Sequence, residues 1–217
     1  MLLGGCQAKT IPATEENVRY EQNYELTGEE KKELIGTVNP AIFTIVDRGN
    51  PEAEAVSIPV VPKAGEEIHL KTGRYMITGY PTGNIYVFDA EGKQIVREIV
   101  GDYAGAGSLT VSVEETYTIR ADGWYDSIEI YPSPTTLNTD LTAGLWEVGK
   151  DIKAGQYKIS LDQGYGYLQI LEKGNDPILY ELIGGTIGRT ESLLELKEGQ
   201  WLRVTDTSLI TFRPTDT

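Results

Sequence analysis

The chain carries an internal repeat, and this repeat limits the folds open to it more than any other feature does. The segment GRYMI at residues 73–77 matches GQYKI at 155–159, and IEIYP at 128–132 matches ITFRP at 210–214. Four further matches lie between these two in the same order, and the offset stays between 82 and 85 residues. Six ordered matches at a nearly constant offset predict a domain that has been duplicated.

Each copy has the pattern of a small β domain. About seven short apolar runs follow one another at turn-rich intervals, and alternation is clear in YKISL at 157–161 and YLQIL at 167–171. Period-two alternation places one face of a strand in a core and the other in water. We therefore predict an all-β fold of two tandem small β-sandwich or jelly-roll-like domains, with an N-terminal tether and one short helix.

The domain boundaries follow from changes in composition. Residues 1–25 open with MLLGGCQ, which resembles a lipobox remnant, and continue as a flexible tether. Residues 57–132 read as the first β module, and residues 141–217 as the second. Residues 133–140, which follow Pro132, contain Pro134 and carry no charge before Asp140, read as a semi-rigid linker.

Residues 26–56 are predicted to form a short helix and a strand that dock on the first module. Thr27 and Glu30 have the spacing of a capping box, and Gly36 is placed to end a helix that runs to Ile35. The apolar run at residues 41–46 reads as a strand.

The chain is acidic throughout, with 19 basic and 33 acidic residues and a net charge of −14. The charge is spread evenly, with −5 in residues 1–56, −5 in 57–132 and −4 in 140–217. Because a uniformly negative surface repels phosphate backbones, a nucleic-acid partner is not expected.

The first residues, MLLGGCQ, resemble the lipobox of bacterial lipoproteins. Small residues at Gly4 and Gly5 suit a signal-peptidase cleft, and the thiol of Cys6 would accept the lipid. The resemblance implies a signal peptide, a membrane anchor at Cys6 and a place on the extracellular face of the cell membrane. Cys6 is the only cysteine, so no intrachain disulfide is expected.

A second resemblance covers residues 141–214 closely and residues 57–132 weakly. The segment GLWEVGKDIKAGQY at 144–157, with ITFRP at 210–214, is similar to the "G-x-Y/W-x-V-G-x-D-I-x-A-G-x-Y" repeat of lipid-anchored surface proteins of Gram-positive bacteria, an uncharacterised lipoprotein family. The resemblance implies a β-repeat architecture and a location at the cell surface, and it implies no enzymatic activity. Physically, Asp151 is expected to accept backbone N–H groups in a turn, Ile152 to enter the core, and Tyr157 to begin an inward-facing strand.

Catalytic groups are scarce in the sequence. His69 is the only histidine, so neither a nucleophile with its base nor a clustered zinc site is expected. The loop Asp122-Gly-Trp-Tyr-Asp126 is the best calcium candidate, but two carboxylates fall short of known loop patterns. We predict no catalytic residues, no metal site and no cofactor.

Aromatic side chains in predicted loops are the one suggestive feature. Trp124 and Tyr125 lie in one such loop, and Tyr165 and Tyr167 lie around a Gly-x-Gly pattern. Exposed rings stack on sugars, so these four are the candidate ligand contacts. The alternative is core or edge packing, with the glycines making room for bulky neighbours. Trp146 and Trp201 lie in predicted strands and are expected in the core.

These features predict a non-catalytic cell-surface lipoprotein that acts as a binding or adhesion module for a carbohydrate or another cell-wall ligand. A duplicated site would raise effective affinity. Two alternatives stay open. One is a structural or accessory envelope protein that pairs with a protein partner, and the more remote one is a glycoside hydrolase that uses two unmarked carboxylates.

Overall fold

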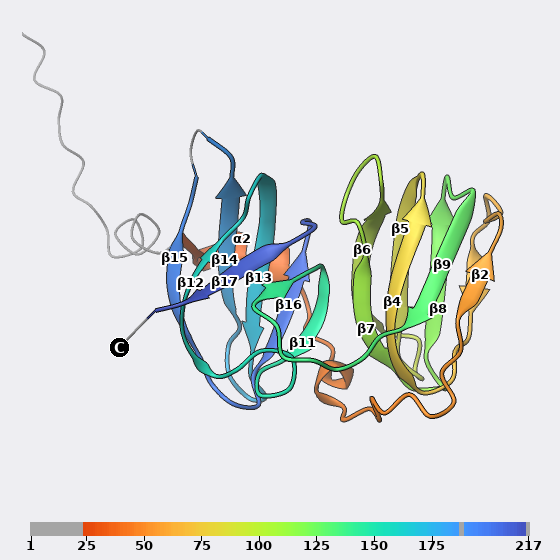
Figure 1. Ribbon diagram of the computed structural model, residues 1–217, viewed down its shortest axis with the longest axis horizontal. Helices are drawn as coiled ribbons and strands as arrows, with labels where there is room; N and C mark the ends of the chain where they lie inside the picture. Colours follow the sequence, from red (N-terminus) through yellow and green to blue (C-terminus); the bar gives the residue numbers. More distant parts are fainter. Residues whose placement is uncertain (1–23, 187–188, 216–217) are drawn as a thin grey trace, which may run out of the picture.

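The computed structural model describes residues 24–186 and 189–215. Short β-strands dominate these residues, and α2 (Gly28–Ile35) is the one α-helix among them. The all-β fold class predicted from the sequence is therefore confirmed. Two sandwich-like halves lie side by side (Figure 1). We call residues 56–132 the first half and residues 140–215 the second half.

Eight strands form the first half, in two layers. One layer has the order β2-β9-β4-β7, and the other has the order β3-β8-β5-β6. Their bounds are β2 (Val56–Ile58), β3 (Glu66–Ile68), β4 (Gly73–Tyr80), β5 (Thr82–Phe88), β6 (Gln94–Gly101), β7 (Leu109–Val113), β8 (Thr118–Gly123) and β9 (Ser127–Pro132).

The second half has the same arrangement. One layer has the order β10-β17-β12-β15, and the other has the order β11-β16-β13-β14. Their bounds are β10 (Asp140–Leu141), β11 (Gly144–Glu147), β12 (Gly155–Ser160), β13 (Gly164–Leu171), β14 (Ile178–Gly184), β15 (Ser192–Leu196), β16 (Trp201–Thr205) and β17 (Ile210–Pro214).

Side chains at matched positions make matched contacts. The hydroxyl of Tyr75 donates to the carbonyl of Lys71 at 2.8 Å, and the hydroxyl of Tyr157 donates to the carbonyl of Lys153 at 2.9 Å. Both rings are buried, and each hydroxyl reaches back four residues along the chain. A strand number n in the first half thus corresponds to strand n + 8 in the second.

The two halves share one sheet where β7 meets β11. The N–H of Thr110 donates to the carbonyl of Ala143 at 2.9 Å, and Gly144 pairs with Thr110 in a parallel bridge. Gly144 has φ +147°, and a Cβ at this position would lie 2.2 Å from the Thr110 carbonyl oxygen. Only glycine permits this close approach of backbones.

Each half buries its own apolar cluster between its two layers. The cluster of the first half also takes in Leu145, Leu171 and Trp201 from the second half. The contact between the halves is therefore partly apolar and not only a linker connection. In the second half Ile152 is fully buried and Tyr157 is 4% exposed, as predicted for the core.

The linker at residues 133–140 is held by hydrogen bonds at its end. Asn138 Oδ1 accepts the N–H groups of Thr139 and Asp140, and the N–H of Asn138 donates to the Asp151 carbonyl at 2.7 Å. The end of the linker is therefore held against the turn that follows β11 in the second half.

The segment before the first half contacts both halves (orange in Figure 1). β1 (Glu25–Leu26) pairs with β14, and Leu26 and Ile35 pack on Leu179 of the second half. Helix α2 therefore lies against the second half, whereas sequence analysis placed the whole segment on the first. Thr27 precedes the helix without a side-chain capping bond, and Gly36, at φ 60°, ends it.

The strand predicted at residues 41–46 is wrong. Residues Pro40–Phe43 form a 3₁₀ helix, η1, because Pro40 begins it and the Asn39 side chain accepts the N–H of Ala41 at 2.9 Å. Ile42 is buried in the core of the first half, so η1 fastens the segment there.

Candidate functional site

A cluster of buried charges joins the halves. The Asp151 carboxylate contacts Arg48 at 2.9 Å and Arg74 at 3.3 Å, and Glu147 contacts Arg48 at 3.2 Å. Arg74 comes from β4 of the first half, Arg48 from the preceding segment, and the two acids from the second half. Asp151 also accepts the N–H of Glu147 at 2.7 Å, as its place in a turn predicted.

Two tryptophans cover the arginines of this cluster. The guanidinium of Arg74 lies 4.7 Å from the ring centroid of Trp146, and that of Arg48 lies 5.2 Å from Trp201. Burial lowers the pKa of Arg74 to about 10, and the charge of Asp151 opposes this shift. Loss of one partner from a buried ion pair is costly, so this cluster opposes separation of the halves.

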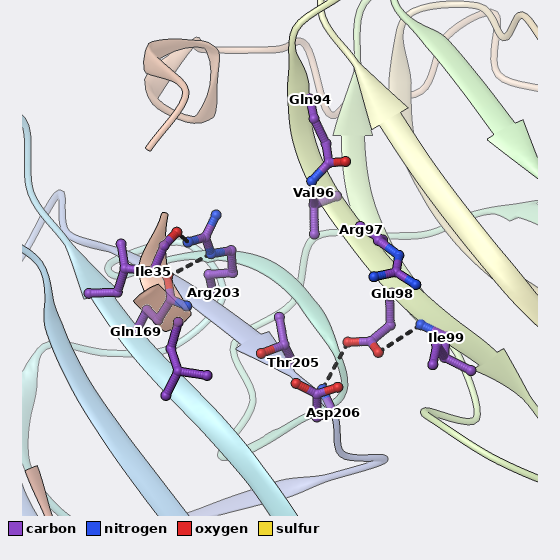
Figure 2. Close-up of a pocket in the computed structure, with 11 residues that line it drawn as sticks. Ile35, Gln94, Val96, Arg97, Glu98, Ile99, Gln169, Arg203, Thr205 and Asp206 are labelled. Atoms are coloured by element: carbon purple, nitrogen blue, oxygen red, sulfur yellow. Dashed lines mark hydrogen bonds between the residues drawn. The ribbon is translucent and has the colours of Figure 1, made fainter. Parts of the chain in front are cut away.

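A cavity of about 230 Å³ opens between the halves, as Figure 2 shows. We call it the polar pocket. Its walls come from α2, β6, β13 and β16. They are lined by Leu34, Ile35, Gln94, Val96, Arg97, Glu98, Ile99, Gln169, Arg203, Thr205 and Asp206.

Glu98 crosses from β6 to the second half. Its carboxylate accepts the N–H of Ile99 at 2.9 Å and the N–H of Asp206 at 2.9 Å, and the residue is 2% exposed. Burial raises the pKa of Glu98 to about 7, although both hydrogen bonds act in the opposite direction. Burial also raises the pKa of the neighbouring Asp206.

Arg203 lies on the opposite wall of the polar pocket. Its Nε donates to Gln169 Oε1 at 2.7 Å, and its Nη2 donates to the carbonyl of Ile35 at 3.1 Å. Desolvation lowers its pKa to about 10, and no acid among the described residues opposes this shift. In Figure 2 the remaining guanidinium nitrogen points away from both acceptors.

A second hollow, of about 640 Å³, adjoins the polar pocket at Ile99 and Asp206. We call it the aromatic groove. It is lined by Ile99, Ala104, Gly105, Asp162, Gln163, Gly164, Tyr165, Asp206, Thr207, Ser208 and Leu209. Tyr165 is 60% exposed here, and its ring packs edge-on against Tyr167 at 6.5 Å.

The four aromatic residues predicted to contact a ligand do not share one surface. Tyr165 lines the aromatic groove, and Tyr167 beside it is half-buried. Trp124 is 76% exposed in the first half, with the Lys63 ammonium 5.7 Å from its ring, and it lines neither the polar pocket nor the aromatic groove. The predicted lipid site, Cys6, lies outside the described residues.

The prediction of an exposed ring at Tyr125 is wrong. Tyr125 is 2% exposed, and its hydroxyl donates to the Val100 carbonyl at 2.8 Å. A Cβ at Gly79 would lie 2.2 Å from this ring, and one at Gly83 would lie 2.4 Å from it. The two glycines therefore form the slot that holds Tyr125, which is the packing role considered as the alternative.

The polar pocket contains four charged residues that were not predicted from the sequence: Arg97, Glu98, Arg203 and Asp206. A signal for one of them exists in the sequence. Glu98 is in phase with Val96 and Val100, so alternation along β6 predicts a buried side chain at its position. A charge at a core position indicates either an internal partner or a site. Arg203 has no such signal, because it alternates with the apolar Leu202 and Val204, and Asp206 has none because it lies in a turn.

Asp122, one of the two acids considered for metal binding, has other contacts. Asp122 Oδ1 accepts the side-chain N–H of Asn84 at 2.8 Å, and Oδ2 lies 3.7 Å from Arg120. Within residues 24–186 and 189–215, no group of three histidine, cysteine or acidic residues is placed to hold an ion.

No helix of the described residues has the length and apolar character that crossing a bilayer requires. Comparisons of the chain with protein-family models and with curated proteins found no match.

Proposed function

We propose that this protein is a non-catalytic, lipid-anchored protein of the bacterial cell surface that binds a cell-wall ligand. The proposed location at the cell surface rests on the lipobox-like sequence ending at Cys6 and on the repeat motif similar to that of Gram-positive surface lipoproteins. On this proposal Cys6 carries the lipid, and the halves face outward from the membrane.

We also infer that the halves arose by duplication. The equal strand orders and the matched hydroxyl bonds of Tyr75 and Tyr157 support this, together with the constant sequence offset. The duplication has not kept two equal sites. The halves instead combine to form one composite cleft, since the polar pocket and the aromatic groove draw residues from both.

The observation that carries the proposed function is the exposed ring of Tyr165 in a groove between the halves. A flat apolar ring stacks on a sugar or an extended chain, while neighbouring amides and carboxylates such as Gln163 and Asp162 orient it. The buried charge cluster fixes the groove in advance, which lowers the ordering cost of binding.

A binding screen tests this proposal. The full chain carrying Cys6→Ser is applied to insoluble cell-wall preparations and to a glycan array. We expect binding that Tyr165→Ala weakens at least tenfold and that Tyr131→Ala leaves unchanged, because Tyr131 is an exposed tyrosine outside the cleft. Trp124→Ala, tested in parallel, reports whether the first half adds a contact. Absence of any binding, or full binding by Tyr165→Ala, would refute the proposal.

The anchor is tested separately. Labelling of bacteria with a fatty-acid analogue is expected to mark the wild-type protein and not Cys6→Ser. Equal labelling of both forms, or labelling of neither, contradicts the proposed lipid anchor at Cys6.

A further inference from the structure

The outer edge of β6 differs from that of its counterpart, β14. In the second half β14 is not the last strand of its sheet, because β1 pairs with it antiparallel. In the first half β6 ends its sheet, and no strand among the described residues pairs with its outer edge. An uncovered strand edge carries unpaired N–H and C=O groups that can bind another chain.

Strand register identifies the positions that β1 covers. Ile85 pairs with Glu98, and its counterpart Leu168 pairs with Tyr180. Glu98 therefore occupies the position of Tyr180, and Arg97 that of Leu179. Because β1 pairs with Leu179 and Tyr180, the corresponding uncovered edge of the first half lies at Arg97 and Glu98.

This edge is closed on both sides of Arg97. On one side, Asn39 Nδ2 donates to the carbonyls of Lys93 at 3.2 Å and Gln94 at 3.3 Å. On the other side, the N–H of Ile99 donates to Glu98 Oε1, and the carbonyl of Ile99 accepts the N–H of Ala106 at 2.8 Å.

Between these contacts, the main chain of Arg97 faces outward. Successive residues of a strand direct their N–H and C=O groups to alternate edges. Arg97 therefore directs its groups to the same side as Ile99. Arg97 also lines the polar pocket, so the uncovered edge opens into that cavity.

Arg203 completes the pocket. It is 8% exposed, and it bonds only to neutral acceptors, Gln169 and the carbonyl of Ile35. A buried cation without an anionic partner costs free energy, whereas a guanidinium with a free nitrogen binds a carboxylate strongly. The pocket thus offers a strand edge on one wall and an uncompensated cation on the other.

We propose that the polar pocket binds an extended peptide that ends in a carboxylate. Its main chain adds to the outer edge of β6 at Arg97, as β1 adds to β14, and its carboxylate pairs with Arg203. This inference rests on the proposed function, because it names the ligand class of one part of the composite cleft.

The two acids of the pocket are compatible with such a ligand. The Glu98 oxygens both accept backbone N–H groups, so they are occupied within the protein. The positive charge of Arg97 stabilises the charged forms of both Glu98 and Asp206, and a side-chain hydrogen bond from Thr205 further stabilises that of Asp206. A ligand with an amine in place of the carboxylate would be repelled by Arg203, which makes amine binding an opposing outcome.

The test uses acetyl-Val-Thr-Val with a free carboxylate, the same peptide as its amide, and acetyl-Val-Thr-diaminobutane, which ends in an amine. Calorimetric titration of the full chain is expected to show that the free acid binds at least tenfold more tightly than either other form. Arg203→Gln should abolish this preference. Equal affinities, preference for the amine, or no binding of the free acid up to millimolar concentration would overturn the inference.

A second pair of variants tests the strand edge. Arg97→Pro removes the outward N–H, and Arg97→Ala keeps it while removing the same side chain. We expect Arg97→Pro to bind the free acid at least tenfold more weakly than Arg97→Ala does. Equal binding by the two variants contradicts the pairing with β6.

Gln169→Glu keeps the test decisive if Arg203→Gln does not fold. This change is isosteric and places a carboxylate at the atom that Arg203 Nε contacts at 2.7 Å. The internal carboxylate should reduce the preference for the free acid at least fivefold, and an unchanged preference counts against Arg203. The result is separable from the screen with Tyr165→Ala, because cell-wall binding through the aromatic groove without peptide binding refutes this inference alone.

Discussion

Arg74 of the first half and Asp151 of the second form an ion pair across the interface, with Nη2 and Oδ1 3.3 Å apart and each side chain 1% exposed. Arg48 shares the same carboxylate. Asp151→Ala would leave two buried guanidinium groups without their main counter-charge. We expect the free energy of unfolding to fall by about 3–5 kcal/mol, measured by denaturant titration. Glu195→Ala, at an exposed acid of β15, is the control and should change it by less than about 0.5 kcal/mol. A loss below about 1 kcal/mol for Asp151→Ala would show that the cluster does not hold the halves together.

Glu98 makes stability depend on pH near neutrality. Its pKa of about 7 in the folded protein lies above the ordinary value of 4.5, so the folded state binds more protons than the unfolded state between these values. The free energy of unfolding should therefore decrease as pH rises from about 4.5 to 7, by roughly 3 kcal/mol at most. The raised pKa of Asp206 adds a change of the same sign, and Arg97 opposes it.

Glu98→Gln isolates this contribution. Denaturant unfolding at pH 5, 6, 7 and 8 should show a flatter dependence than in the wild type, with the smaller part due to Asp206 remaining. If the variant keeps the full slope, Glu98 does not titrate in this range.

Gly144→Ala tests the junction between β7 and β11. The new Cβ would lie 2.2 Å from the carbonyl oxygen of Thr110, so the strands must separate. Gly174→Ala is a matched control, because Gly174 also has positive φ, at +87°, but no atom lies within 4 Å of the added Cβ. We expect a loss of about 1 kcal/mol at Gly174 and at least twice that at Gly144, by thermal or denaturant unfolding. Equal losses of stability in the two variants would show that β7 and β11 can separate at Gly144 without a cost in free energy.

Trp124 and Tyr125 are adjacent in sequence and should respond in opposite ways to truncation. Tyr125→Ala empties the slot between Gly79 and Gly83 and removes the hydrogen bond to the Val100 carbonyl, so we expect a loss of about 3–5 kcal/mol. Trp124→Ala removes an exposed ring and should change stability by less than about 0.5 kcal/mol. Denaturant titration of both variants measures the difference. Similar losses in both variants would contradict the burial described for this loop.

Periodicity was sufficient to predict the fold class and several core residues. Alternation in YKISL and YLQIL places strands at β12 and β13, where the structure has them. The helix was also predictable, because Gly36 marks its end. These signals are local, and each depends on a few neighbouring residues.

The errors came from contacts between residues far apart in sequence. Tyr125 is buried by glycines more than forty positions earlier, and no local pattern around Tyr125 shows them. The run at residues 41–46 has strand composition, but Pro40 and the side chain of Asn39 favour a 3₁₀ turn. In that case a residue just outside the apolar run decided the conformation.

The composite cleft could not be predicted from the sequence for a further reason. Comparison of the two copies reveals what they share, whereas the polar pocket depends on how they differ. Arg203 and Glu98 each come from one half only, and their meeting depends on the orientation that Arg74, Asp151 and Gly144 impose. The charge that Glu98 places in phase with core residues was the only available indication.

The buried charge cluster also limits how this architecture can be taken apart. A fragment ending before residue 133 would expose Arg74 without its carboxylate, and a fragment starting at residue 140 would expose Asp151 without either arginine. Neither copy can then be transplanted alone into a chimaera without a surplus ion at its surface. The smallest fragment that keeps all of these buried charges paired contains both halves and the preceding segment, which supplies Arg48.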